Sequence, residues 1–193
     1  MEDLLETNEQ LELARKYVEE TNTNIFLTGK AGTGKTTFLK TLKETTFKRM
    51  IVVAPTGVAA INAQGVTIHS FFQVSFGPFI ESRADNNDTK YRFSRQKKEI
   101  IRSLDLLVID EISMVRADLL DAIDYTLRRF RKGGKNLPFG GVQLLMIGDL
   151  QQLPPVCKDE EWNLLRNYYD TQYFFSSLAL KKSNFITINL QKV

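Results

Sequence analysis

The chain has 193 residues, of which 42% are hydrophobic and 25% are charged, and its formal net charge is +3. This composition suits one folded domain of ordinary size rather than a disordered chain. A single cysteine, Cys157, and a single histidine, His69, exclude an internal disulfide framework and a Cys/His zinc site, which fits a reducing compartment. No stretch approaches the roughly 18 apolar residues of a membrane span, and the acidic start is unlike a signal peptide. We therefore expect an intracellular protein that does not enter membranes, cytoplasmic if bacterial and nuclear or mitochondrial if eukaryotic.

Predicted helices and strands alternate along the chain. Residues 7–10 (TNEQ) have the spacing of a helix capping box, and apolar residues at helical intervals after them predict a helix over 8–20. Five short apolar runs predict strands at 24–28, 50–54, 106–109, 143–147 and 185–190. Runs that are apolar on both faces and separated by helical stretches are typical of a parallel sheet with helices on both faces. We expect a doubly wound α/β fold.

Residues 73–98 interrupt the alternation. A polar turn cluster at 85–88 stands there between aromatic and basic residues. We interpret this stretch as an insertion projecting from the sheet, which divides the domain into residues 1–72, 73–98 and 99–193. The insertion holds six basic and three acidic residues, an excess equal to the net charge of the chain. A solvated hairpin without a role is the alternative.

A second basic cluster, at 128–135, follows a helical apolar stripe and is interpreted as the complement of a helix C-terminus.

Residues 29–36 (GKAGTGKT) match the spacing of a phosphate-binding loop, directly after a predicted strand and at the start of a predicted helix. The glycines let backbone N–H groups turn toward a polyphosphate, and the positive end of the helix dipole points to the same place. Lys35 would neutralise the β- and γ-phosphates of ATP, and Thr36 offers a hydroxyl to Mg²⁺. The candidate nucleotide-binding residues here are Gly29, Ala31, Gly32, Thr33, Gly34, Lys35, Thr36 and Thr37.

Two further loops follow predicted strands, where open α/β sheets bind their ligands. Asp110 and Glu111 come directly after residues 106–109. We expect Asp110 to hold Mg²⁺ through water, together with Thr36, and Glu111 to act as general base for the attacking water. Residues 148–156 follow the strand at 143–147, and Gln152 is a candidate γ-phosphate sensor. From residue types alone, a loop stiffened by two prolines explains this last stretch equally well.

Taken together, five stretches of the chain resemble the PIF-one (petite integration frequency) helicases of the B branch of helicase superfamily one. They are residues 29–36, 54–60, 67–72, 110–111 and 148–156. Residues 121–132 and 138–143 resemble the segment that separates this family from its RecD-like relatives. The resemblance implies a RecA-like P-loop NTPase domain that uses ATP and Mg²⁺ to move 5′ to 3′ along single-stranded DNA. It also implies unwinding of duplex, fork and G-quadruplex DNA in repair, recombination and telomere maintenance, with residues 73–98 as a wedge subdomain at the duplex junction.

The resemblance assigns roles to single residues as well. Gln10 would read the adenine, a task that competes with its capping-box interpretation. Thr56 and Gly57 would present a hydroxyl and a backbone N–H to DNA phosphates. His69, Ser70 and the neighbouring aromatic rings would meet phosphate or base. The implied DNA-binding residues are Pro55, Thr56, Gly57, Val58, Thr67, His69, Ser70 and Phe72. A structurally satisfied histidine, with Phe71 and Phe72 in the core, is the alternative left open.

In this family a second RecA-like domain follows the first, and ATP lies between the two. The family's pattern continues, past the position of Val193, into a motif whose arginine reaches the γ-phosphate, and such an arginine can be worth roughly 10³–10⁵ in turnover. We therefore expect a fragment of a longer helicase that binds nucleotide but hydrolyses it slowly without its partner domain.

Two rival functions remain. A nucleotide kinase leaves residues 54–60, 65–72 and 148–156 unexplained, and the other rival is a non-catalytic module that binds nucleotide and DNA.

Overall fold

The computed structural model describes residues 9–84 and 93–191, and these form a six-stranded sheet in which all neighbours are parallel. The strand order is β3-β2-β4-β5-β1-β6. The strands are β1 (Asn24–Gly29), β2 (Met50–Ala54), β3 (Val66–Thr67), β4 (Leu106–Ile109), β5 (Gln143–Gly148) and β6 (Phe185–Leu190). Five of them are the strands predicted from apolar runs. The sequence missed β3, because a two-residue strand is too short to show a pattern.

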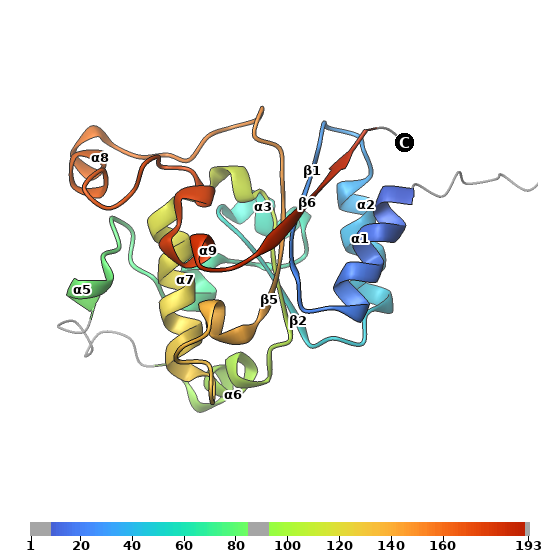
Figure 1. The fold of residues 1–193 in the computed structure, drawn as a ribbon, viewed down its shortest axis with the longest axis horizontal. Coiled ribbons are helices and arrows are strands. Elements are labelled where there is room, and N and C mark those ends of the chain that lie inside the picture. The colour runs from blue at the N-terminus through green and yellow to red at the C-terminus, as the bar shows by residue number, and fades with distance from the viewer. Residues whose placement is uncertain (1–8, 85–92, 192–193) are drawn as a thin grey trace, which may run out of the picture.

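Helices cover both faces of this sheet, which confirms the predicted α/β class (Figure 1). One face carries α1 (Glu9–Glu20) and α2 (Lys35–Thr45), and α7 (Ala117–Phe130) packs on the other. The shorter helices are α3 (Gly57–Asn62), α4 (Ile68–Phe72), α5 (Glu81–Ala84), α6 (Arg95–Ser103), α8 (Asp159–Leu165) and α9 (Leu178–Lys181), with 3₁₀ turns η2 (Ile112–Met114), η3 (Pro138–Gly141) and η4 (Phe174–Ser176). The predicted helix over 8–20 is α1, while residues 7 and 8 of the proposed capping box lie outside the described residues.

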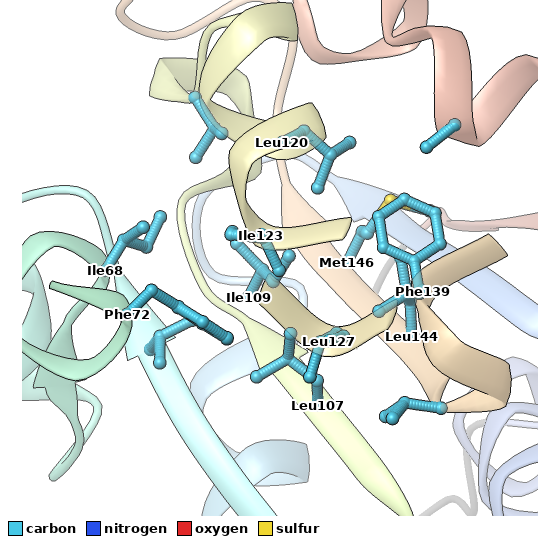
Figure 2. Packing of buried hydrophobic residues seen from close by; sticks show 14 of the residues in the cluster. Ile68, Phe72, Leu107, Ile109, Leu120, Ile123, Leu127, Phe139, Leu144 and Met146 are labelled. Atoms are coloured by element: carbon cyan, nitrogen blue, oxygen red, sulfur yellow. The ribbon is translucent and has the colours of Figure 1, made fainter. Parts of the chain in front are cut away.

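The two faces of the sheet build two separate cores, because successive side chains of a strand point to opposite sides. In β4, Leu106 and Val108 pack with α1 and α2, whereas Leu107 and Ile109 pack with α7. Figure 2 shows the second core, where Leu120, Ile123 and Leu127 of α7 lie over the sheet. Each such side chain contributes about 1.5–3 kcal/mol when buried. A strand buried on both faces must be apolar throughout, which is why these runs were readable from the sequence.

Helix α7 also anchors the loops around it through three buried aspartates. Asp118 accepts a hydrogen bond from the Phe79 backbone N–H at 2.9 Å, and Asp124 accepts one from the Phe139 N–H at 2.6 Å. Asp121 accepts hydrogen bonds from the side chains of Tyr169 and Ser177 and from the backbone N–H groups of Leu178 and Ala179. These donors replace the water that the carboxylates lose on burial. Segments far apart in sequence are thereby fixed to one helix.

The described parts of the predicted insertion pack against the domain at both ends. Ile80 and Phe93 are each 8% exposed, and the Phe93 ring lies edge-on to Phe130 with centroids 4.9 Å apart. Helix α6 begins at Arg95, so the predicted boundary at residue 98 falls inside a helix. Of these flanks, Phe93 belongs to the second core of the sheet and Val74 packs against it. The turn cluster at 85–88 lies outside the described residues, and the division into three segments stays a prediction.

The second basic cluster complements the C-terminus of its own helix, because Arg128 and Arg129 lie in the last turn of α7, and Arg131 complements that of a neighbouring helix as well. Arg131 donates to the backbone carbonyls of Ile101, Arg102 and Leu104 at the end of α6, as well as to Gly140. Arg128 pairs with Glu81 and with the buried Asp124. Within the described ranges, no helix combines the length and apolar character needed to cross a membrane.

Candidate functional site

The carboxyl ends of the six strands share one edge of the sheet, because all strands run in the same direction. At the centre of this edge, β1, β5 and β4 lead into residues 29–37, 149–152 and 110–111, which we call the phosphate region. On the far side of β4, β2 and β3 lead into residues 55–58 and 67–76, which we call the β2–β3 region. The sheet therefore brings together the predicted nucleotide residues and places the predicted DNA residues beside them.

Glycine backbone geometry shapes the loop of the phosphate region. Gly32 and Gly34 adopt left-handed conformations with φ of 80° and 89°, which side chains disfavour. At Gly29, a Cβ atom would lie 2.7 Å from the Thr33 hydroxyl and 2.8 Å from the Leu190 carbonyl oxygen. Helix α2 has Gly34 as its N-cap, which offers no side-chain acceptor to the first turn. The first backbone N–H groups of α2 are therefore the natural partners of an anion at this loop.

Polar side chains of the loop bond to its own backbone. Lys35 Nζ donates to the carbonyl oxygens of Gly29 and of Lys30, the latter at 2.9 Å. The Thr33 hydroxyl donates to the same Lys30 oxygen at 2.9 Å. Thr36 and Thr37 are exposed at the start of α2. A phosphate bound here would compete with these neutral carbonyls for the Lys35 ammonium, and a charged acceptor makes the stronger hydrogen bond.

Asp110 and Glu111 extend from the end of β4 toward this loop. Burial raises the pKa of Asp110 to about 6; the negative charge of Glu111 adds to the rise, and the positive charge of Lys35 opposes it. The charges of Glu111 and Lys35 thus both lie close enough to Asp110 to act on it. Carboxylate and hydroxyl oxygens, such as those of Asp110 and Thr36, are the kind of donors that Mg²⁺ prefers, and a cation would stabilise the disfavoured charged form of Asp110. The donor set therefore fits a magnesium ion.

The turn after β4 is tightly packed against β5. Glu111 adopts the left-handed conformation, with φ of 53° and ψ of 43°, which non-glycine residues rarely do. At Gly148, a Cβ atom would lie 2.9 Å from Ile112 Cγ2 and 3.1 Å from the Ser113 nitrogen. The Ser113 hydroxyl is buried without a hydrogen-bond partner in the described part of the chain. The turn that carries Glu111 and the end of β5 thus meet without space for an added methyl group, which restricts the backbone of that turn.

Asp149 is a residue of the site to which the sequence assigned no role. Its carboxylate accepts from the Gln151 backbone N–H at 2.9 Å and from the Gln152 side-chain amide at 3.3 Å. The Gln152 backbone N–H also donates to the Asp149 carbonyl at 3.0 Å. Asp149 is 9% exposed, whereas Gln152 is exposed, so a buried carboxylate orients an accessible amide. An aspartate two residues before a backbone donor is a known turn pattern and could have indicated this role.

Gln10 lies at the same edge, beside the start of the phosphate loop. Its side-chain oxygen accepts a hydrogen bond from the Gln191 backbone N–H at 3.0 Å, just after β6. Strand β6 pairs with β1 so that Leu190 stands opposite Gly29. The predicted adenine-reading glutamine is therefore attached to the strand next to the loop.

In the β2–β3 region, two threonines cap short helices. Thr56 accepts a hydrogen bond from the Ala59 N–H at the start of α3, and Thr67 accepts one from the Ser70 N–H at the start of α4, each at 3.2 Å. Pro55 is half-buried, Gly57 and Ser70 are exposed, and Val58 is 71% exposed. Each threonine hydroxyl thus has a structural task as an acceptor and keeps its proton for another partner.

The aromatic residues of this region fall into two groups. The Phe72 ring is 1% exposed in the second core, so the prediction that it contacts DNA is wrong and the core alternative holds (Figure 2). The Phe72 ring points into the core because α4 packs its apolar face on the sheet. His69 Nδ1 bonds the Val74 carbonyl oxygen at 3.0 Å, and its ring stacks on Phe76 with centroids 4.4 Å apart. No sequence pattern distinguishes Phe76 from the other aromatic residues of the insertion.

A phosphate loop after one strand, an Asp-Glu pair two strands away and an oriented glutamine on the strand between them define a RecA-like P-loop NTPase domain. The sequence profile of PIF1-like helicases matches residues 6–192. The chain belongs to this family.

Individual relatives agree with this assignment. The chain is 42% identical over 179 residues to the ATP-dependent DNA helicase PIF1 of Saccharomyces cerevisiae strain YJM789, an alignment that covers 90% of this chain and 19% of the yeast protein. A crystal structure of Pif1 helicase from Bacteroides in complex with ADP-AlF3 and single-stranded DNA superposes with a TM-score of 0.86 at 44% identity, over 99% of this chain and 43% of that one. A structure of two coordinating Pif1 helicases that unwind forked double-stranded DNA gives 0.84 at 44% identity, over 96% of this chain and 43% of that one. The chain thus spans less than half of each of these relatives.

Proposed function

We propose that this chain is the first motor domain of an ATP-driven helicase, which binds ATP with Mg²⁺ in the phosphate region and single-stranded DNA along the β2–β3 region. The observation that carries this proposal is the meeting of Lys35, Asp110 and Glu111 at one end of the sheet, directly beside the ends of β2 and β3. The relatives support it, because the yeast protein is an ATP-dependent DNA helicase and the Bacteroides Pif1 helicase was crystallised in complex with ADP-AlF3 and single-stranded DNA.

In this proposal each polar group of the phosphate region has a task. The Lys35 ammonium leaves its loop carbonyls and neutralises the β- and γ-phosphates. Asp110 and Thr36 would hold Mg²⁺, which when bound neutralises charge that develops on the phosphates. Glu111 accepts the proton of the attacking water, and Gln152, oriented by Asp149, contacts the γ-phosphate.

The proposal also covers contacts to the adenine and to the DNA phosphates, and the further parts of the longer protein. Gln10 reads the adenine from the end of β6. Backbone N–H groups of residues 57 and 58 and the hydroxyls of Thr56 and Thr67 contact DNA phosphates. A second RecA-like domain completes the nucleotide site, and residues 73–98 belong to a wedge. Translocation from 5′ to 3′, unwinding of forks and G-quadruplexes, work in DNA repair, recombination and telomere maintenance, and an intracellular location belong to the same proposal.

The two regions are mechanically connected through the sheet. The Asp110 backbone N–H donates to the Val53 carbonyl oxygen at 2.9 Å, so the residue that holds the metal in this proposal is bonded to the strand that leads to Thr56. A shift of Asp110 between nucleotide states would therefore act on β2. This bond supports the proposal that DNA and nucleotide bind to one coupled unit rather than to two independent surfaces.

The test is to measure ATP and single-stranded DNA binding to this chain, separately and together, and ATP turnover of the full-length protein with and without DNA. Glu111→Gln should keep both affinities and lower DNA-stimulated turnover at least about 100-fold, because it removes the general base. Glu44→Gln is the matched control, since Glu44 is exposed near the far end of α2. Unchanged turnover in Glu111→Gln would remove Glu111 from the mechanism. Turnover that requires a small phosphate acceptor instead of DNA would support a kinase.

A further inference from the structure

We infer that Phe76 is a base-stacking residue: its exposed ring, supported on His69, forms a platform for one base of single-stranded DNA. This inference rests on the proposed function and adds to it a specific contact with a base, whereas the residues that the proposed function assigns to DNA contact its phosphates.

The exposure of Phe76 is unusual for a ring that is held in a stack. It is 86% exposed, although its ring lies 4.4 Å from the His69 ring with an interplanar angle of 29°. Because so little of it is covered, the face that does not meet His69 is open to solvent. A base placed on that face would continue the stack as base, Phe76 and His69, in the near-parallel geometry that aromatic rings favour.

Two sets of hydrogen bonds hold the ring in position. His69 Nδ1 donates to the carbonyl oxygen of Val74 at 3.0 Å. This bond fixes the plane of the imidazole and ties it to the backbone two residues before Phe76. On the other side, Arg116 donates to the Gly77 carbonyl at 3.0 Å, and Asp118 accepts from the Phe79 N–H at 2.9 Å. The platform is thus bound from both α4 and α7. A ring ordered in advance loses little entropy when a base binds.

The position of the platform agrees with a role in DNA binding. Thr67, which caps α4, pairs with Ala54 at the end of β2, so the helix that carries His69 begins next to the turn that contains Thr56. A strand whose phosphates lie along these turns would have its bases within reach of the ring. Stacking tolerates any base, because every base has a π face, and this suits a motor that moves along arbitrary sequence.

The experiment is equilibrium binding of a labelled single-stranded oligonucleotide and of the same strand with abasic sites. Phe76→Ala should bind the normal strand about tenfold more weakly than wild type, and Phe76→Trp should bind it as well as wild type. On the abasic strand, wild type and Phe76→Ala should bind equally. Phe47→Ala is the matched control, because Phe47 is 98% exposed and precedes β2, at the opposite edge of the sheet.

The outcomes separate this inference from the proposed function. Wild-type protein that binds no single-stranded DNA would overturn the proposed function, and with it the platform. Wild-type binding with an unimpaired Phe76→Ala variant would overturn the platform alone. A deficit that persists in full on the abasic strand would also overturn it, since the ring would then act on local structure instead of on a base. ATP affinity, measured on each variant, should equal that of wild type.

Discussion

The phosphate region and the β2–β3 region stand at one edge of the same sheet but are built by different means. In the phosphate region the backbone makes the shape: Gly29, Gly32 and Gly34 adopt conformations with positive φ, and the Lys35 ammonium bonds to carbonyl oxygens. In the β2–β3 region side chains make it, through the caps of Thr56 and Thr67 and the stack of His69 on Phe76. Ligand binding in a region shaped by the backbone should weaken when a side-chain atom is added to a glycine. A region shaped by side chains should instead be destabilised when a hydrogen-bond or ion-pair partner is removed.

The largest effect is expected at Arg116, which supports the β2–β3 region from α7. Its guanidinium makes two hydrogen bonds to Asp118 and one each to Glu161 and the Gly77 carbonyl, with 12% of the side chain exposed. Arg116→Met leaves the buried Asp118 without its cation and should lower the free energy of unfolding by about 3 kcal/mol. Chemical denaturation measures this, and DNA affinity of the folded protein should fall more than ATP affinity.

The control for Arg116 is Arg49, which pairs with Asp105 on the surface with 65% of its side chain exposed. Arg49→Met should leave the free energy of unfolding close to that of wild type, because water screens an exposed pair. Adding Asp118→Asn to Arg116→Met should recover part of the loss, since no unpaired buried charge then remains. Equal losses of ATP and DNA affinity in Arg116→Met would contradict the prediction that Arg116 supports the β2–β3 region in particular.

An intermediate effect is expected when one methyl group is added to the phosphate loop. In Gly29→Ala the new Cβ would stand 2.7 Å from the Thr33 hydroxyl, at a φ of 154°, so the loop must shift. Such overpacking typically costs about 1–3 kcal/mol, and ATP affinity, measured by titration calorimetry, should fall at least about tenfold.

Gly57→Ala makes the same chemical change in the other region, where the added Cβ would meet no heavy atom within 4 Å beyond its chain neighbours and the backbone of its own helix. Stability and ATP affinity should then stay within about 0.5 kcal/mol of wild type. If both alanine variants bound ATP equally well, the phosphate region would not depend on backbone shape.

The smallest effect is expected at the caps of the short helices. Thr56→Val keeps the shape of the side chain but removes the acceptor for the Ala59 N–H, and should destabilise the protein by about 1 kcal/mol. Thr56→Ser retains the acceptor and should restore most of this stability in a thermal unfolding experiment. A valine variant as stable as wild type would show that the cap adds nothing and that the hydroxyl serves only a ligand.

Elements were predicted correctly from the sequence where the local residue pattern follows directly from the place of the element in the fold. Strands buried on both faces are continuous apolar runs, and five of the six described strands were readable for that reason. The phosphate loop was also readable, because its glycine spacing is required by its own backbone. Strand β3 was not, since two residues, Val66 and Thr67, belong to the sheet only by pairing with β2.

Aromatic and charged side chains were harder to place, because their type does not say which neighbours they meet. Phe72 and Phe76 stand four residues apart, yet one is 1% and the other 86% exposed. Arg131 was correctly interpreted as structural, but its guanidinium donates to carbonyls at the end of α6 and to Gly140 instead of to its own helix. Asp149 was passed over, although it orients Gln152.

The sequence by itself determined the α/β class, most strands and the phosphate loop, since periodic burial and glycine spacing are properties of short segments. The tertiary structure decided which separate loops meet at the edge of the sheet, that Lys35 acts on the charge of Asp110, and that Phe76 is supported by His69. The physical reason is that strand order, which brings β5 between β1 and β4, follows from packing over the whole chain, whereas each motif reports only on its own surroundings.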